Sequence, residues 1–264
     1  MYPGLTHFYC SPYTLRSTCA HKAHVTLRVH GSLLRKSWYS LKIKWVIILI
    51  VLILVSCQNK SLAQQTIFNV PSADVTEKGK IFLQHESQFS NKFGLFTHYG
   101  AYGIGKNTEL DLTLFGVGTK NIRNEVLGVG FKTSIPLHEK SETKLTFGTL
   151  VPISLRRNGV GGYTYSHLST RLPKLKTRIT SGVFVGTTSV FGRDFVSFIG
   201  GIEQPVTKKF SIVMDWYSGK HSNGFFIPGF AYAFKHATLW AGYQIHNNKE
   251  NGNNGFVIEI SKIF

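Results

Sequence analysis

The stretch GFVIEISKIF, residues 255–264, decides the fold class. Side chains alternate along a strand, so Ile258 and Ile260 face one side while Glu259 faces the other. The chain ends on Phe264 within this strand. An unpaired last strand is prone to aggregate, and a sheet that closes so that its last strand pairs with its first has no such edge. The pattern therefore predicts a β-barrel.

The same alternation recurs along the chain between breaks rich in Gly, Asn and Lys, and no window keeps a helical period for three turns. We therefore expect an all-β, closed antiparallel barrel of about twelve strands. The expected strands are residues 79–90, 94–104, 108–118, 123–135, 143–155, 160–170, 176–189, 194–204, 208–218, 224–234, 237–247 and 255–264.

The charged residues indicate where the polar face of these strands lies. Asp, Glu, Lys and Arg make up only 16% of the chain, against roughly 25% in soluble domains, and they cluster in the breaks. A transmembrane barrel turns its apolar face to lipid and its polar face to the lumen. The outward set is expected to include Ile212, Met214, Leu239, Ala241, Ile258 and Ile260, and the inward set Ser211, Asp215, Gln244 and Glu259.

Serial strands, a signal-like leader and a terminal aromatic residue resemble bacterial outer-membrane β-barrels. The resemblance covers about residues 79–264 and is to the class, not to a particular family. It implies a location in the outer membrane, contact with outer-membrane lipids, and recognition of the last strand by the barrel assembly machinery. Lys262 departs from that signal, because it stands where Tyr or an aliphatic residue is usual. The residues that match the signal are Phe256, Ile258, Ile260 and Phe264.

Residues 1–63 are interpreted as a leader for export. The segment KIKWVIILIVLILVSC, residues 42–57, places lysines before an apolar run that suits a secretory signal and is short for a membrane-spanning helix. Either Cys57 is acylated in a lipobox, or the chain is cut after Ala63; we favour the second. Residues 1–40 could be an over-extended gene start. Residues 64–78 are then expected to form a periplasmic segment, and 79–264 the barrel.

The net charge is divided between the leader and the body, residues 64–264. The chain has 30 Lys and Arg against 13 Asp and Glu, but eight of the bases and none of the acids lie in the leader, which leaves the body at +9. All three cysteines also lie in the leader, so the body has no disulfide and no cysteine-based metal site. We expect no cofactor, no metal and no nucleic-acid partner.

The leading functional hypothesis is a structural or passive-permeation role, that of a small porin-like barrel rather than an enzyme. The body charge of +9 makes anionic small solutes a possible cargo, although charge alone is thin support. The lumen is expected to be filled by paired charges. The candidate lumen residues are Asp111, Lys144, Arg178, Glu203, Asp215 and Glu259.

Two alternatives stay open. Residues 218–224, SGKHSNG, resemble the His-x-Ser-Asn stretch of outer-membrane phospholipase A and the lipid A deacylase. In those enzymes His and Ser share one strand face, whereas His221 and Ser222 are adjacent, so an acyl hydrolase is the weaker hypothesis and a polar loop the stronger. The other alternative is a lipid-anchored periplasmic binding barrel.

Overall fold

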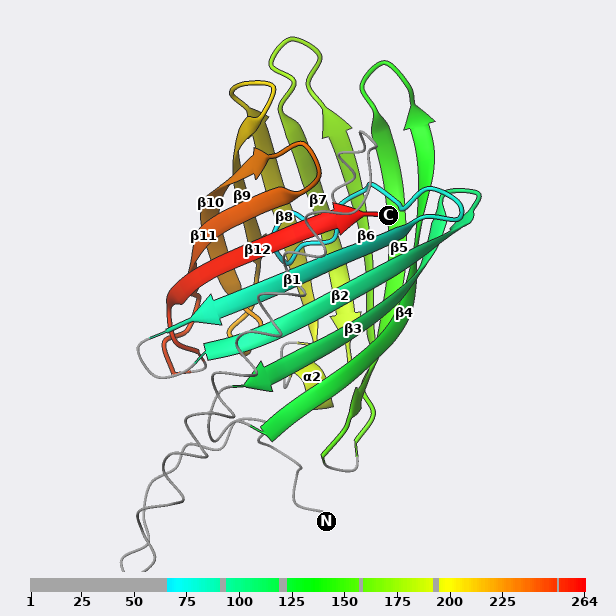
Figure 1. Ribbon diagram of the computed structural model, residues 1–264. Coiled ribbons are helices and arrows are strands. Elements are labelled where there is room, and N and C mark those ends of the chain that lie inside the picture. The colour runs from blue at the N-terminus through cyan, green and yellow to red at the C-terminus, as the bar shows by residue number, and fades with distance from the viewer. Residues whose placement is uncertain (1–65, 91–93, 119–122, 157–158, 192–194, 251) are drawn as a thin grey trace, which may run out of the picture. The chain divides into compact units, whose positions relative to one another are not determined.

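The computed structural model describes residues 66–90, 94–118, 123–156, 159–191, 195–250 and 252–264. Twelve antiparallel strands form one closed barrel, in which each strand pairs with its neighbours in sequence and the last pairs with the first (Figure 1). The prediction of a closed antiparallel barrel is confirmed. The leader, with Cys57 and Ala63, lies outside the described residues.

The strands agree closely with the alternating stretches of the sequence. They are β1 (Ile81–Phe89), β2 (Gly94–Gly105), β3 (Thr108–Gly118), β4 (Arg123–His138), β5 (Thr143–Ser154), β6 (Tyr163–Arg171), β7 (Arg178–Gly186), β8 (Val196–Pro205), β9 (Phe210–Tyr217), β10 (Phe225–Ala233), β11 (Thr238–His246) and β12 (Gly255–Ile263). One short helix, α2 (Thr188–Phe191), lies between β7 and β8. No helix in the described part of the chain is long and apolar enough to cross a membrane.

The seam between β1 and β12 closes the barrel. Beyond the paired strands, the Phe264 N–H donates to the Ile81 carbonyl at 2.8 Å, and the Ile81 N–H donates back to the Phe264 carbonyl at 3.2 Å. The Lys262 ammonium lies 4.5 Å from the centroid of the Phe264 ring, a cation–π distance. The departure at Lys262 therefore has a structural role, because this lysine packs on the terminal aromatic ring.

The two ends of the barrel differ in the length of their connections. The termini end, where β1 begins and β12 finishes, carries the turns 106–107, 139–142, 172–177, 206–209 and 234–237. The loop end carries longer connections such as 155–162, 187–195, 218–224 and 247–254. In the tightest turn Lys106 and Asn107 have φ of 51° and 56°, as a two-residue type I′ hairpin requires.

The outer face of the barrel is apolar and the inner face is polar. On β12, Ile258 is 43% exposed while its neighbour Glu259 is fully buried; on β9, Ile212 is 44% exposed while Asp215 is 1% exposed. A water-soluble barrel would have the opposite arrangement. The structure is therefore a transmembrane barrel, whose outward residues face lipid.

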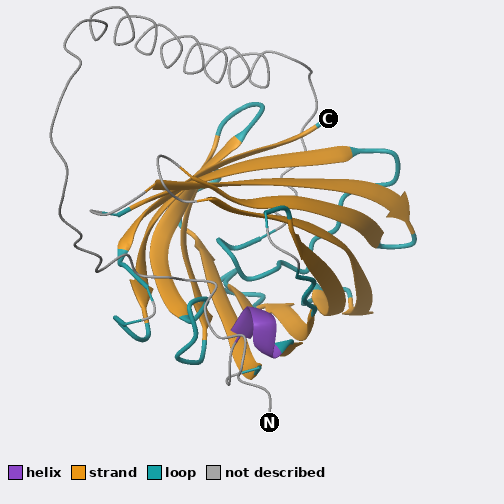
Figure 2. Ribbon diagram, turned by 90° about the horizontal axis from the view of Figure 1, so that it is seen from below, coloured by secondary structure: helices purple, strands orange, loops and turns teal. Residues whose placement is uncertain are grey.

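Residues 66–78, the lumenal segment, lie inside the ring of strands, where Figure 2 shows chain in loop colour. Ile67, Phe68 and Val70 are at most 1% exposed and belong to the same buried cluster as residues of β8 to β12. The expectation of a separate periplasmic segment does not describe these residues. Their apolar side chains are buried on the inner wall instead.

Membrane embedding predicts different outcomes for two exposed leucines. Leu112 lies on the outer face in the middle of β3 and is 55% exposed, whereas Leu175 lies in the 172–177 turn and is 64% exposed. An arginine on the lipid face near the midplane costs about 2–4 kcal/mol and far less near the interface. We expect Leu112→Arg to lower the urea midpoint of the barrel in lipid vesicles, and Leu175→Arg to leave it nearly unchanged. Equal shifts would contradict the membrane assignment.

Candidate functional site in the barrel lumen

Apolar side chains anchor the deepest part of the lumenal segment. Phe68 packs edge-on against Trp240 of β11, with ring centroids 6.3 Å apart. The inner face of the wall supplies room for it through glycine: a Cβ at Gly242 would lie 2.8 Å from Phe68 Cζ. Likewise, a Cβ at Gly201 of β8 would overlap Ile67 Cδ1. The segment is therefore seated in a shaped recess of the wall.

One carboxylate holds the backbone of the segment. Asp215 Oδ2 accepts three consecutive N–H groups, from Phe68 at 3.1 Å, Asn69 at 2.7 Å and Val70 at 2.9 Å. Successive amides that converge in this way form an anion-binding nest. The Tyr217 hydroxyl also donates to the Asn69 carbonyl at 3.0 Å. Hydrogen bonds to a charged group contribute about 1.5–3 kcal/mol each, so Asp215 is a major polar contact of the segment.

Ion pairs hold the segment nearer the termini end. The Asp74 carboxylate lies 3.1 Å from Lys144 Nζ and 2.6 Å from Arg178 Nη1. Burial alone would raise the pKa of Asp74, but the positive charges of Arg178 and Lys144 outweigh it and hold this pKa below its ordinary value. Asp74 is therefore charged throughout the neutral range. Its contribution to stability is fully present above the ordinary pKa and is lost as the pH falls through the lowered pKa.

A buried salt bridge ties the segment to the opposite wall. The Thr76 N–H donates to Glu109 Oε2 at 2.6 Å, and Glu109 Oε1 lies 2.9 Å from Lys132 Nζ. The side chains of Lys132 and Glu109 are 1% and 0% exposed. Removing one partner from such a pair leaves an uncompensated charge and costs about 3–5 kcal/mol.

Acidic residues lie near Thr66, the first described residue of the lumenal segment. Glu86 of β1 and Glu259 of β12 are direct cross-strand partners and both face inward. Gln84 Nε2 donates to Glu259 Oε2 at 3.0 Å and also lies 3.2 Å from the Thr66 hydroxyl. Glu259 Oε1 and Asp215 Oδ1 are buried and accept no hydrogen bond from the described residues. This side of the lumen therefore concentrates carboxyl groups, and the buried pair of Glu86 and Glu259 favours a shared proton over two negative charges.

The candidate lumen residues named from the sequence all lie on the inner side of the wall. Asp215, Lys144 and Arg178 contact the lumenal segment directly. Asp111 lies on the opposite wall, where it accepts the Tyr99 hydroxyl at 2.7 Å, and Glu203 lies 3.8 Å from Arg178. Sequence reasoning missed a further set of lumen residues. For those on strands, the alternation of side chains could have shown that they face inward; for those before β1, the apolar residues there could have indicated burial. These residues are Ile67, Phe68, Asp74, Glu109 and Lys132.

The contacts of His221 are those of a packed side chain. The His221 ring is 8% exposed and packs edge-on against Phe184, with ring centroids 5.7 Å apart. A serine nucleophile needs its base within hydrogen-bond reach. The contacts of this loop therefore give no support to the hydrolase alternative.

No protein-family model and no curated protein matches the chain. Among solved structures, the outer membrane protein Omp33 of Acinetobacter baumannii is similar with a TM-score of 0.45 and 11% identity, over 71% of this chain and 99% of that chain. An outer membrane channel from Pseudomonas putida F1 is similar with a TM-score of 0.40 and 11% identity, over 77% and 100%. On its own strand pairing and apolar outer face, the present chain has the fold of a transmembrane β-barrel.

The recess for the segment can be tested with two neighbouring glycines. Gly201 faces Ile67, whereas a Cβ at Gly200 would meet only the Thr180 carbonyl oxygen at 3.7 Å. In the cysteine-free body carrying Val70→Cys, we expect Gly201→Val to displace the segment and speed alkylation of the cysteine by a water-soluble maleimide. Gly200→Val should leave the rate unchanged. Slow alkylation in both variants would show that the recess does not position the segment.

Proposed function

We propose that this protein is an outer-membrane barrel that admits small solutes through a lumen gated by its own N-terminal segment. The observation that carries the proposal is the nest around Asp215, where a single carboxylate holds three backbone amides of the segment inside the barrel. The ring of strands closes without the segment, because each strand pairs with two neighbouring strands. The segment can therefore leave the lumen while the wall stays closed.

The orientation of the barrel follows from its two ends. An even number of strands returns the chain to the side on which it started, and outer-membrane barrels keep short turns on the periplasmic side and longer loops outside. By this rule the termini end is periplasmic and the loop end faces the exterior. The segment then enters the lumen from the periplasmic side, through Lys78, which bridges to Gly103 of β2.

The lumen charges favour cations over anions, in contrast to the expectation from the body charge of +9. The inward acids outnumber the inward bases, and those bases lie toward the termini end or pair with acids. The acids are Asp74, Glu86, Glu109, Asp111, Glu203, Asp215 and Glu259; the bases are Lys132, Lys144, Arg171 and Arg178. The surplus of basic residues in the body therefore lies outside the lumen, and the inner side of the barrel has more acidic than basic residues.

Gating by the segment is tested by removing its main polar contact. We expect Asp215→Ala to raise the open probability of single channels in planar bilayers, since three amides of the segment lose their acceptor. Asp111→Asn is the matched control. This substitution also removes an inward carboxylate, but Asp111 accepts a hydrogen bond from Tyr99 on the opposite wall and has none with the described residues of the segment. If both variants gate alike, the effect comes from lumen charge and the gating proposal fails.

Selectivity gives an independent test of the lumen charge. In a gradient of potassium chloride across the bilayer, the reversal potential of the open channel should have the sign of potassium permeation. The physical reason is the excess of acidic over basic residues on the inner wall, which attracts cations wherever those carboxyl groups are ionised. A reversal potential of the opposite sign would contradict this assignment and restore the anionic class of solute.

A further inference from the structure

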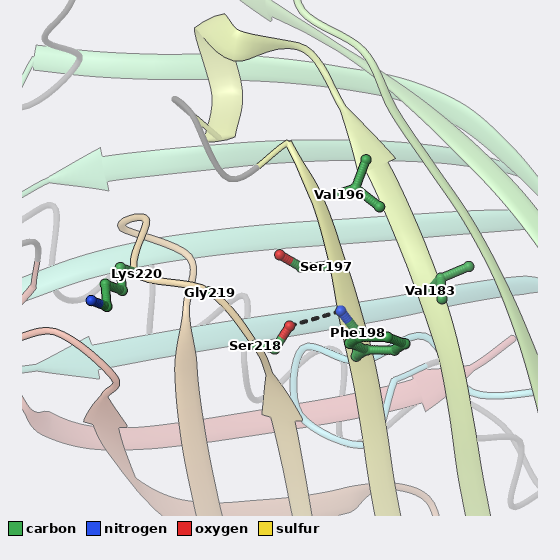
Figure 3. Close-up of a pocket in the computed structure, with 7 residues that line it drawn as sticks. All are labelled: Val183, Val196, Ser197, Phe198, Ser218, Gly219 and Lys220. Carbon is green, nitrogen blue, oxygen red and sulfur yellow. Dashed lines mark hydrogen bonds between the residues drawn. The ribbon is translucent and has the colours of Figure 1, made fainter.

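The pairing between β8 and β9 changes its pattern at the loop end. The register of these strands ends at Ile199 and Tyr217. Past that pair, the Ser218 N–H donates to the Phe198 carbonyl at 2.9 Å, while the Phe198 N–H donates to the Ser218 hydroxyl at 2.7 Å (Figure 3). A side chain thus replaces the backbone acceptor, and the paired register of the two strands does not extend further.

A groove of about 440 Å³ lies at this position. One side is apolar, made by Val183 of β7 with Val196 and Phe198 of β8, which are 42%, 56% and 63% exposed on the outer face. The other side is polar, made by the loop residues Ser218 to Lys220. The groove is therefore amphipathic, with its apolar side on the lipid-facing surface and a lysine at its margin.

We propose that this groove binds a phosphate-bearing anionic lipid, with an acyl chain along Val183, Val196 and Phe198 and the phosphate beside Lys220. Lipid is the substance that covers an outward apolar surface of a transmembrane barrel. A lysine near the membrane surface attracts anionic headgroups. The groove also lies at the ends of the strands, where headgroups meet the wall. The proposal concerns the outer wall and is independent of permeation through the lumen.

The loop that carries Lys220 is held in one position. Gly219 has φ of 96°, which side-chain-bearing residues rarely adopt. A Cβ at this glycine would lie 2.7 Å from the His221 ring and 3.0 Å from the Ser197 hydroxyl. The loop therefore lies close against β8, which places the backbone of Lys220 beside the groove.

The test is native mass spectrometry of the whole protein extracted from membranes, with phosphatidylglycerol or zwitterionic phosphatidylcholine added. We expect wild-type protein to retain phosphatidylglycerol in preference to phosphatidylcholine. Lys220→Gln should weaken retention of phosphatidylglycerol about fivefold, whereas Lys249→Gln, an exposed lysine in another loop at the same end, should not. Val196→Trp, which fills the groove from the lipid face, should reduce retention of both lipids.

Four results would overturn the proposal. Equal effects of Lys220→Gln and Lys249→Gln would show attraction by general surface charge, and unchanged retention in Val196→Trp would show that the groove is not the site. If inorganic phosphate abolished the preference for phosphatidylglycerol, the groove would bind anions in general and not a lipid. A dimer that Val196→Trp dissociates would identify a second copy of the chain as the occupant. The urea midpoint of each variant checks that the barrel is folded.

Discussion

The structure depends on one constraint: no backbone amide or carbonyl in lipid can remain unpaired. The mutual hydrogen bonds of Ile81 and Phe264 extend the β1–β12 seam and remove the last open edge. Closure then fixes each side chain to one face, with Ile258 to lipid and Glu259 to the lumen. The polar interior that results needs partners, and the lumenal segment supplies amides to Asp215 and a carboxylate to Arg178.

The sequence alone predicted those parts of the structure that arise from local periodicity. The alternation around Ile212 and Asp215 was enough to define β9 and the direction of its side chains. The position of residues 66–78 was not predictable in this way, because its contacts join distant parts of the chain. Asp215 bonds amides about 145 positions earlier, and the recess for Phe68 exists only because Gly242 has no side chain there.

The net charge of the body shows that composition alone does not predict the character of the lumen. The body is basic as a whole, yet acidic residues outnumber basic residues on the inner wall, and they include the cross-strand pair Glu86 and Glu259 and the nearby Asp215. A sum over residues carries no information about which face each one occupies, whereas strand parity does. For His221 and Ser222 the limit was different: strand parity already separated them, and the structure adds the packing of His221 on Phe184.

The central claim is that residues 66–76 occupy the permeation path. The most direct test compares planar-bilayer conductance of the complete body with that of a body beginning at Glu77, after heat-modifiable electrophoretic mobility confirms that both barrels are folded. We expect brief, infrequent openings for the complete body, because the segment blocks the lumen, and a steadily open channel for the shortened one. Indistinguishable conductance from the two folded proteins would contradict it, because the segment would then not lie in the path.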